Sequence, residues 1–471
     1  MASAGFGDEA AVDTRTATPW AERRLHFIGI GGAGMSGLAL VCARLGAKVT
    51  GSDRNDSSYM ERLRQAGLDP AVGHDAANLP EGAEVVVSTA IAAENPELAL
   101  ARERGIAPIH RGALLAQLCA EKRLIAIAGT HGKTTTTAMA VWALRAIGAD
   151  PAFLVGGEVP GVGEEGAAAN AGWGEGEWVV AEADESDASF LELKPEIAVV
   201  TNVELDHHAR WGSLAELYES FEGFVKPARK VVLPAEADIR SGQSRQLDSA
   251  NPLYARVTAS KKVQRFSDAT PGPETLPLAV PGAHNRANAR AALAAIELTG
   301  LDVESAAAAL ADFPGVRRRL ELKGSRGATR VYDDYAHHPT EVRAALSALR
   351  ELQPEHLIAV FQPHLYSRTK ALGEEFGAAL ALADEAVVLD VYPAREEPVG
   401  ELAGVSGLRV AQAAAERMGG RPVWWLPDAG TARRALADRL DREREDGDGT
   451  VLVTIGAGDV FKLGEALVAA G

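Results

Sequence analysis

Residues 124–137 read LIAIAGTHGKTTTT, and this stretch decides the fold of the chain around it. An apolar run ends at Ala128, a turn of glycine and small residues follows through Gly132, and Lys133 stands before four threonines and an apolar helix. Strand, glycine turn, lysine and helix in this order are typical of a loop that holds phosphate groups. The usual pattern has a glycine at the position of Ile127, so the loop is a shortened variant. We predict a nucleoside triphosphate site; the alternative is an ordinary strand-to-helix turn.

The chemistry of this loop follows from its residue types. Backbone N–H groups and the helix N-terminus attract anions, and Lys133 is expected to reach the outer phosphates. The hydroxyl of Thr134 is expected to bind Mg²⁺. The predicted ATP-binding residues of the loop are Gly129, Thr130, His131, Gly132, Lys133, Thr134 and Thr135.

Length and composition exclude several classes of protein. The 471 residues are too many for one core and indicate roughly three domains. The net charge of −17 argues against a nucleic-acid partner, and no apolar segment is long enough to span a bilayer, so we expect no membrane partner. Cys42 and Cys119 lack metal-ligand spacing and fit buried thiols in a reducing cytosol, so the predicted location is cytoplasmic.

A second glycine loop lies near the N-terminus, in the stretch 25–53. Gly29, Gly31 and Gly34 have the G-x-G-x-x-G spacing directly after a predicted strand, and Asp53 ends the next strand. This pattern favours a nucleotide or dinucleotide site over a purely structural turn. Other residues assigned to this site are Gly32 in the loop, and Ser88 and Thr89 after a later strand.

Acidic residues and histidines follow two predicted strands, WVVA and IAVVTN, of the second domain. We expect these strands to be neighbours in one parallel sheet, which aims the side chains after them at the phosphate loop. Each acid taken singly fits a solvated surface group, but their clustering favours Glu182 and His207 as Mg²⁺ ligands. The glycine-rich residues 152–176 are predicted to form a loop.

Two later features are candidates for nucleotide binding. Asn285 and Asn288 open a predicted helix, and their amides can pair with a purine edge, although Asn285 also fits a helix cap. The arginines 317–319 follow a Pro-Gly turn and fit either a triphosphate clamp or a solvated hinge.

The remaining sequence predicts a further doubly wound sheet, with strands near 357–361, 386–391, 423–426 and 450–455. Arg368 follows one strand and is suited to hold the carboxylate of a small zwitterion. The predicted fold is α/β with three domains: Rossmann-like, P-loop ATP-binding and Rossmann-like. The predicted segments are 1–22 as a flexible extension, 23–118, 119–316 and 317–471.

Taken together, these motifs resemble the Mur ligases of bacterial peptidoglycan synthesis, in the family's order from residue 25 onward. The matching stretches are GIGGAGMSGLA (29–39), GTHGKTTTT (129–137), AEADESDASFL (181–191), TNVELDH (201–207), HNRANA (284–289), the arginines 317–319, DDYAHHPTEV (333–342) and FQPHLYSRT (361–369).

The resemblance implies that the three domains hold a uridine nucleotide, ATP and an amino acid, in that order. It implies roles for these residues: Lys133, Glu182, His207 and His337 in catalysis; Thr134, Glu182 and His207 on Mg²⁺; Asn285 and Asn288 near adenine; Arg318 on phosphates; and Tyr335, His337 and Arg368 around the amino acid. Leu320, Ala336 and Leu365 depart from residues frequent in the family, and Leu365 replaces an expected arginine.

The implied reaction uses ATP and Mg²⁺ to join L-alanine to the lactyl carboxylate of UDP-N-acetylmuramate through an acyl phosphate, by a monomer or homodimer. A sister ligase that attaches a recycled tripeptide is the closest alternative. A nicotinamide-dependent dehydrogenase explains only the first glycine loop, and a nucleotide-dependent switch explains only the second.

Overall fold

The computed structural model describes residues 18–205, 211–234, 262–266, 278–443 and 449–469. The chain forms two compact units, with the break after Leu114, and each is described by itself. The first unit contains one sheet and the second contains two, so the predicted three-sheet α/β architecture is confirmed. Among the described helices, none combines the length and the apolar character needed to cross a bilayer.

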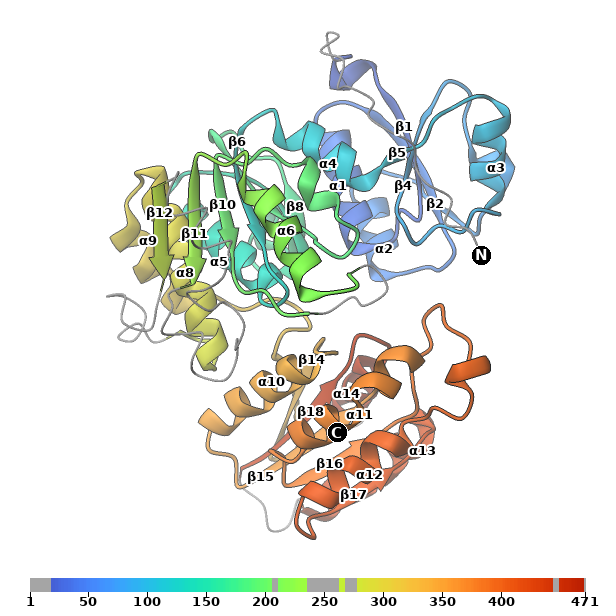
Figure 1. Cartoon of the computed structure of the whole chain (residues 1–471), viewed down its shortest axis with the longest axis vertical. Coiled ribbons are helices and arrows are strands. Elements are labelled where there is room, and N and C mark those ends of the chain that lie inside the picture. The colour runs from blue at the N-terminus through green and yellow to red at the C-terminus, as the bar shows by residue number, and fades with distance from the viewer. Residues whose placement is uncertain (1–17, 206–210, 235–261, 267–277, 444–448, 470–471) are drawn as a thin grey trace. The chain divides into compact units, whose positions relative to one another are not determined.

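The sheet of the first unit is parallel throughout, with strand order β3-β2-β1-β4-β5 (Figure 1). This order is that of a dinucleotide-binding fold. Helices on both faces explain why four of the five residues of β1 are buried. The elements are η1 (Trp20–Glu22), β1 (Arg24–Ile28), α1 (Ala33–Arg44), β2 (Lys48–Asp53), α2 (Ser58–Gln65), β3 (Ala71–Val72), η2 (Ala76–Asn78), β4 (Glu84–Val87), α3 (Pro96–Glu103), β5 (Ile109–His110) and α4 (Arg111–Cys119), which runs across the break.

The second unit begins with a seven-stranded sheet of order β12-β11-β10-β6-β9-β7-β8, antiparallel only where β8 pairs with β7. Its elements are β6 (Arg123–Ala128), α5 (Lys133–Ala146), β7 (Ala152–Val159), η3 (Glu164–Gly166), β8 (Ala169–Gly172), β9 (Trp178–Glu182), η4 (Ser189–Glu192), β10 (Ile197–Val200), α6 (Leu214–Val225), β11 (Lys230–Pro234), β12 (Lys262–Phe266), α8 (Ala283–Thr299), α9 (Val303–Ala309) and η6 (Leu310–Asp312).

Two predictions about this sheet are wrong. Residues 152–176 contain the strand β7 and the edge strand β8 instead of a loop. Their glycines are needed for close packing, since a Cβ at Gly156 would lie 2.6 Å from Glu182 Oε2. The strands WVVA (β9) and IAVVTN (β10) are also not neighbours, because β6 lies between them and pairs with both. The phosphate loop after β6 therefore lies between the two groups of polar side chains.

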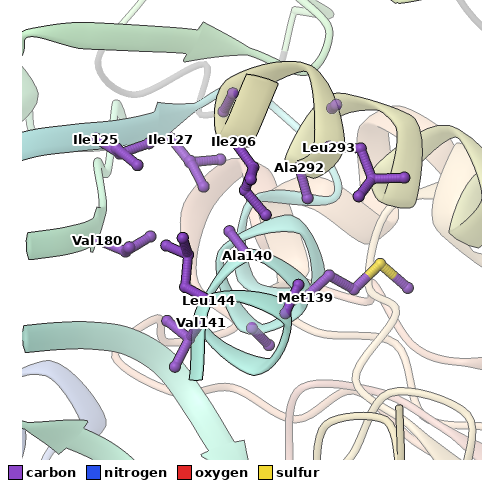
Figure 2. Close-up of a cluster of buried hydrophobic side chains, with 14 of the residues drawn as sticks. Ile125, Ile127, Met139, Ala140, Val141, Leu144, Val180, Ala292, Leu293 and Ile296 are labelled. Atoms are coloured by element: carbon purple, nitrogen blue, oxygen red, sulfur yellow. The ribbon is translucent and has the colours of Figure 1, made fainter. Parts of the chain in front are cut away.

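The core of this sheet supports the helix behind the loop. Figure 2 shows side chains of β6 and β9 meeting the inner face of α5, while α8 packs against the same helix. Ile125 and Ile127 of β6 are fully buried, as are Met139 and Leu144 of α5. Burial of this apolar area stabilises the strand–loop–helix unit and so fixes where the loop begins and ends.

The last sheet has the order β13-β14-β18-β15-β16-β17, with only β13 antiparallel. The strands predicted near 357–361, 386–391, 423–426 and 450–455 are confirmed as β15 to β18 within a few residues. The elements are β13 (Glu321–Arg326), β14 (Thr329–Asp334), α10 (Pro339–Glu351), β15 (His356–Phe361), α11 (Tyr366–Leu380), β16 (Glu385–Val388), η7 (Gly400–Leu402), α12 (Leu408–Arg417), β17 (Val423–Trp425), α13 (Ala429–Glu443), β18 (Thr450–Ile455) and α14 (Phe461–Ala469).

Candidate active site

The phosphate loop joins β6 to α5 and needs glycine at two positions. Gly129 and Gly132 have φ angles of +135° and +81°, in the region that favours glycine. A Cβ at Gly129 would collide with the hydroxyl of Thr201, and one at Gly132 with the amide oxygen of Asn288. The close approach of α8 and of the segment after β10 therefore explains both glycines.

The loop is held by the residues that follow β10. The hydroxyl of Thr130 donates to the backbone oxygen of Glu204 and accepts from its N–H, both at 2.9 Å. The side chain of Asn202 accepts from the N–H of His131 and donates to its carbonyl oxygen. These bonds fix the backbone of the loop before any ligand arrives, which lowers the entropic cost of binding phosphate.

Lys133 lies within the loop that it is predicted to serve. Its Nζ donates to the carbonyl oxygens of Gly129 and Thr130 and lies 2.8 Å from a carboxylate oxygen of Glu185. Burial raises the pKa of Glu185 to about 7, although the charge of Lys133 opposes this shift. Burial alone would lower the pKa of Lys133, but nearby carboxylates outweigh it and raise this pKa. The lysine is therefore charged and forms an ion pair with Glu185.

The two described groups predicted to hold Mg²⁺ are adjacent. The hydroxyl of Thr134 donates to Glu182 Oε1 at 3.0 Å, and Glu182 Oε2 accepts from the N–H of Gly156 at 2.7 Å. A hydroxyl and a carboxylate are hard oxygen donors of the kind that Mg²⁺ prefers, so these residues fit the ion. The third predicted ligand, His207, lies outside the described residues.

A cavity of about 400 Å³ opens beside the loop. Its wall includes several predicted ATP-binding residues, namely His131, Gly132, Thr134, Thr135, Asn285 and Asn288. Apolar side chains such as Phe266 and Phe313 cover another part of the wall. A pocket with an apolar wall and a few polar groups next to a phosphate loop suits a purine nucleotide.

The two asparagines of α8 already have partners in the protein. Asn285 donates to the carbonyl oxygen of Pro281 at 2.7 Å, and Asn288 accepts from the hydroxyl of Thr136 at 3.2 Å. Both side chains are nearly buried. The alternative that Asn285 is a helix cap is wrong, because Gly282 is the N-cap of α8 and no side chain caps this helix. Both asparagines line the cavity.

The structure separates the consecutive arginines. Arg318 donates to Asp333 and to the carbonyl oxygens of Gly456 and Gly458, within the last sheet. Arg319, instead, lines the cavity wall. The sequence could not distinguish the two, because Arg318 has a φ of +61° and this local turn sends consecutive side chains in different directions.

The predicted amino-acid site is brought together around His364. The rings of Tyr335 and His337 lie 5.4 Å apart, and those of His337 and His364 lie 6.0 Å apart. Arg368 Nη1 lies 3.4 Å from His364 Nδ1. Burial, aided by the nearby His337 and Arg368, lowers the pKa of His364 to about 4, so its imidazole is neutral near pH 7.

The glycine loop of the first unit is tied to the end of β2. The N–H of Gly29 donates to the carbonyl oxygen of Ser52, and the N–H of Gly31 donates to Asp53 Oδ2 at 2.9 Å. The other predicted members of this site, Gly32, Gly34, Ser88 and Thr89, lie at the start of α1 or directly after β4. All of them therefore follow the carboxyl ends of β1 and β4, where ligands of parallel sheets bind.

A buried carboxylate behind this loop was missed from the sequence. Glu97 is fully buried and accepts hydrogen bonds from Ser52 at 2.7 Å and from Asn78 at 3.1 Å, and it lies 2.9 Å from His26 Nε2. Burial alone would raise the pKa of Glu97, but these hydrogen bonds outweigh it and hold the pKa at about 2. No local sequence pattern links these four residues, because they come from separate strands and helices.

Two further acids beside the phosphate loop were also missed as site residues. Glu204 Oε2 lies 2.9 Å from His131 Nε2, and Glu341 Oε1 lies 3.2 Å from His131 Nδ1. Glu341 had a detectable signal, because it stands three residues after His338 and completes a capping box at the start of α10.

Comparison with known proteins agrees with this geometry. The chain matches the families described as Mur ligase family, catalytic domain (residues 24–123), Mur ligase middle domain (127–296) and Mur ligase, glutamate ligase domain (318–458). It is 43% identical to the UDP-N-acetylmuramate–L-alanine ligase of Streptomyces griseus, covering 96% of this chain and 97% of the relative. It is 44% identical to the enzyme of the same name from Paenarthrobacter aurescens, covering 95% and 97%.

Solved structures give the same result. A UDP-N-acetylmuramate–alanine ligase from Thermotoga maritima superposes with a TM-score of 0.76 at 28% identity, covering 95% of this chain and 98% of that one. A murein peptide ligase from Psychrobacter arcticus has a TM-score of 0.67 at 24% identity, with the same coverage, and so shows the fold alone. With its phosphate loop, its three sheets in order and relatives above 40% identity over nearly its whole length, the chain belongs to the Mur ligase family.

Proposed function

We propose that the chain is an ATP-dependent ligase that joins the amine of L-alanine to the lactyl carboxylate of UDP-N-acetylmuramate, in the synthesis of peptidoglycan precursors. The observation that carries this function is the relationship to enzymes of this activity over 96% of the chain, with the phosphate loop and its acids assembled as phosphoryl transfer requires. The dehydrogenase alternative leaves Lys133 without a role.

The first chemical step is activation of the carboxylate. One lactyl carboxylate oxygen attacks the γ-phosphorus of ATP, the bond to the β-phosphate oxygen breaks, and ADP leaves. Lys133 would stabilise the charge on the transferring group, and Thr134 and Glu182 would hold Mg²⁺. Mg²⁺ held there would neutralise part of the charge on the phosphates. We also propose that Arg319, on the cavity wall, contacts the phosphates alongside or in place of Arg318.

The second step forms the amide bond. The neutral amine of alanine attacks the acyl carbon, and inorganic phosphate leaves from the tetrahedral intermediate. Arg368 would bind the alanine carboxylate, and Tyr335 and His337 would line the site, with His337 as the candidate acceptor of the proton lost by the ammonium group. His364 lies 3.4 Å from Arg368 and is neutral, so it adds no second positive charge that would repel the ammonium group of alanine.

The cellular location and the oligomeric state of the enzyme are further parts of the proposal. We propose that the enzyme works in the cytoplasm, where ATP and the uridine nucleotide are made, and that it is a monomer or homodimer. Size-exclusion chromatography with light scattering measures the assembly directly.

Phosphate release tests the reaction itself. The purified chain with ATP, Mg²⁺ and UDP-N-acetylmuramate is expected to release phosphate at a sustained rate only when L-alanine is added. Parallel reactions contain glycine, L-serine or the tripeptide L-alanyl-γ-D-glutamyl-meso-diaminopimelate in place of alanine. Faster phosphate release with the tripeptide than with alanine would favour the ligase that attaches a recycled tripeptide. Phosphate release at the same rate with and without an amine substrate would contradict a ligase.

A further inference from the structure

Three side chains with metal-binding atoms gather beside the phosphate loop in the second unit. His131 belongs to the loop itself, Glu204 to the segment after β10, and His338 to the start of α10. One nitrogen or oxygen from each lies within 4.8 Å of the other two. His131 Nε2 and Glu204 Oε2 are 2.9 Å apart, and the rings of His131 and His338 are 5.1 Å apart. The proposed ligation chemistry assigns no role to Glu204 or His338, and for His131 it predicts only a place in the ATP-binding loop.

Neighbouring groups orient each member of this cluster. Glu341 Oε1 lies 3.2 Å from His131 Nδ1, which leaves the Nε2 of this ring toward Glu204. The hydroxyl of Thr340 donates to Glu204 Oε1 at 2.9 Å, on the carboxylate oxygen opposite the one near His131. The N–H of Thr340 donates to His338 Nδ1 at 3.4 Å. Contacts of this kind are typical of the residues that support metal ligands from behind.

The charges around His131 favour a cation between the two carboxylates. Glu204 and Glu341 approach the ring from both sides, and His338 is nearly buried. A divalent cation held by His131 Nε2 and Glu204 Oε2 would offset the negative charge of these two carboxylates.

We propose that His131, Glu204 and His338 form a Zn²⁺ site, with Glu341 and Thr340 as supporting groups. Two imidazoles and one carboxylate are a donor set that suits Zn²⁺ and other late divalent metals, whereas Mg²⁺ prefers oxygen alone. The site therefore differs in chemistry from the oxygen site of Thr134 and Glu182. Three protein ligands leave a fourth position for water or another oxygen donor.

Zinc at this place would act on catalysis as an inhibitor. His131 and Glu341 line the cavity beside the loop, so an ion held there ties residue 131 of the loop to the start of α10. The ion would therefore occupy part of the wall of the cavity proposed for ATP, and binding of Zn²⁺ and of ATP are expected to oppose each other. This second claim rests on the proposed function, but Zn²⁺ binding itself does not.

Equilibrium binding tests the site without any turnover. The full chain, freed of metal and without nucleotide, is titrated with Zn²⁺ against a chromophoric chelator in the presence of excess Mg²⁺. We expect one Zn²⁺ per chain, held in the micromolar range or tighter, despite the Mg²⁺. His338→Ala and Glu204→Gln are each expected to weaken this binding by at least about tenfold, and Glu341→Gln, a supporting group, by less.

His284→Ala is the matched control, because His284 is an imidazole on the same cavity wall outside the cluster. It is expected to leave the Zn²⁺ affinity unchanged. Thermal unfolding of each variant identifies any that fail to fold. Because two ligands are replaced in separate variants, the test can still be made if one variant does not fold. The proposal is wrong if the wild type holds no Zn²⁺ under these conditions, or if the folded ligand variants bind it as tightly as the wild type.

Inhibition by Zn²⁺ is tested in a separate kinetic experiment. With free Zn²⁺ fixed by a buffering chelator, phosphate release by the wild type is expected to fall as Zn²⁺ rises, and more ATP is expected to restore it. Inhibition that persists unchanged in Glu204→Gln would refute the inhibitory role at this site, whatever the binding result. A chain that binds Zn²⁺ but shows no ligase activity at all would instead refute the proposed function and leave the metal site standing.

Discussion

The molecule contains two glycine loops, each after the first strand of a mainly parallel sheet and each with a buried carboxylate nearby, yet the pKa values of the two carboxylates shift in opposite directions. Behind the first loop, Glu97 is surrounded by donors and its pKa falls to about 2. Beside the second loop, Glu185 has Lys133 as its counter-charge, and burial raises its pKa to about 7. The hydrogen bonds of Glu97 form a fixed frame behind the first loop. At the second loop, the ion pair of Lys133 and Glu185 can be replaced by an ion pair with a ligand.

The partners of each loop explain this division. In the first loop, Asp53 and Ser52 of β2 accept from the backbone of Gly29 and Gly31, so the loop is closed by its own sheet. In the second loop, a lysine is held by a carboxylate that an incoming phosphate can replace. The first arrangement suits recognition of a nucleotide that does not react, and the second suits phosphoryl transfer.

Removing the lysine should have the largest effect. Lys133→Ala is expected to lower substrate-dependent phosphate release by at least about a thousandfold, because no other described cation occupies the centre of the loop. Steady-state release with both substrates measures this. Lys323→Ala, which removes an ion-paired lysine of the last sheet, is the control and should keep near-normal activity. Unchanged turnover in Lys133→Ala would contradict the assignment of the second loop to chemistry.

Changing the metal carboxylate comes next. Glu182→Ala removes the acid beside Thr134, so the Mg²⁺ concentration for half-maximal activity is expected to rise at least about tenfold, or activity to vanish. A Mg²⁺ titration of phosphate release checks this. Glu177→Ala, just before the same strand, is the control. A wild-type Mg²⁺ dependence in Glu182→Ala would remove this residue from the metal site.

The buried acid of the first unit should affect stability more than chemistry. Glu97→Gln replaces an ionised acceptor with a neutral amide and is expected to cost about 3 kcal/mol of unfolding free energy near pH 7. Because the folded pKa lies below the usual value of 4.5, this contribution is complete above pH 4.5 and is lost as the pH falls toward 2.

Denaturant unfolding of the wild type and Glu97→Gln at several pH values measures that difference. The gap between the two proteins should narrow on acidification. A gap that stays constant from pH 7 to pH 3 would show that Glu97 does not stabilise the frame through its charge.

A single methyl group in the first loop should have the smallest effect. A Cβ at Gly31 would lie 3.0 Å from Asp53 Oδ2 and from Met60 Cγ, so Gly31→Ala is expected to raise KM for UDP-N-acetylmuramate about tenfold through crowding. KM for ATP should not change. An equal rise in KM for both substrates would contradict the proposal that the first loop binds the uridine nucleotide and the second binds ATP.

Local patterns were enough to predict many of the strands and helices, among them the strand, turn and helix around Lys133. The stretch from Gly129 to Thr134 carries its own signal, because strand, turn and helix are consecutive in the sequence. The same holds for the loop from Gly29 to Gly34 and for the strands of the last sheet. Where each of these patterns is confirmed, contacts within the stretch itself decide the structure.

The wrong predictions involve contacts between distant residues. The glycines of 152–176 indicated a loop, but Gly156 lies in the strand β7, where its N–H donates to Glu182 and a Cβ would collide with that carboxylate. The position of β6 between β9 and β10 depends on sheet order, which strand patterns do not encode. His131 and Glu341 are 210 positions apart, so their contact could not be predicted from spacing.

The most direct test of the central claim follows an oxygen atom. UDP-N-acetylmuramate labelled with ¹⁸O in its lactyl carboxylate is incubated with ATP, Mg²⁺, L-alanine and the enzyme, and the released phosphate is examined by mass spectrometry. If the second loop activates the carboxylate as an acyl phosphate, each phosphate released carries one oxygen from the labelled carboxylate. Phosphate without ¹⁸O, formed together with the amide product, would contradict that account.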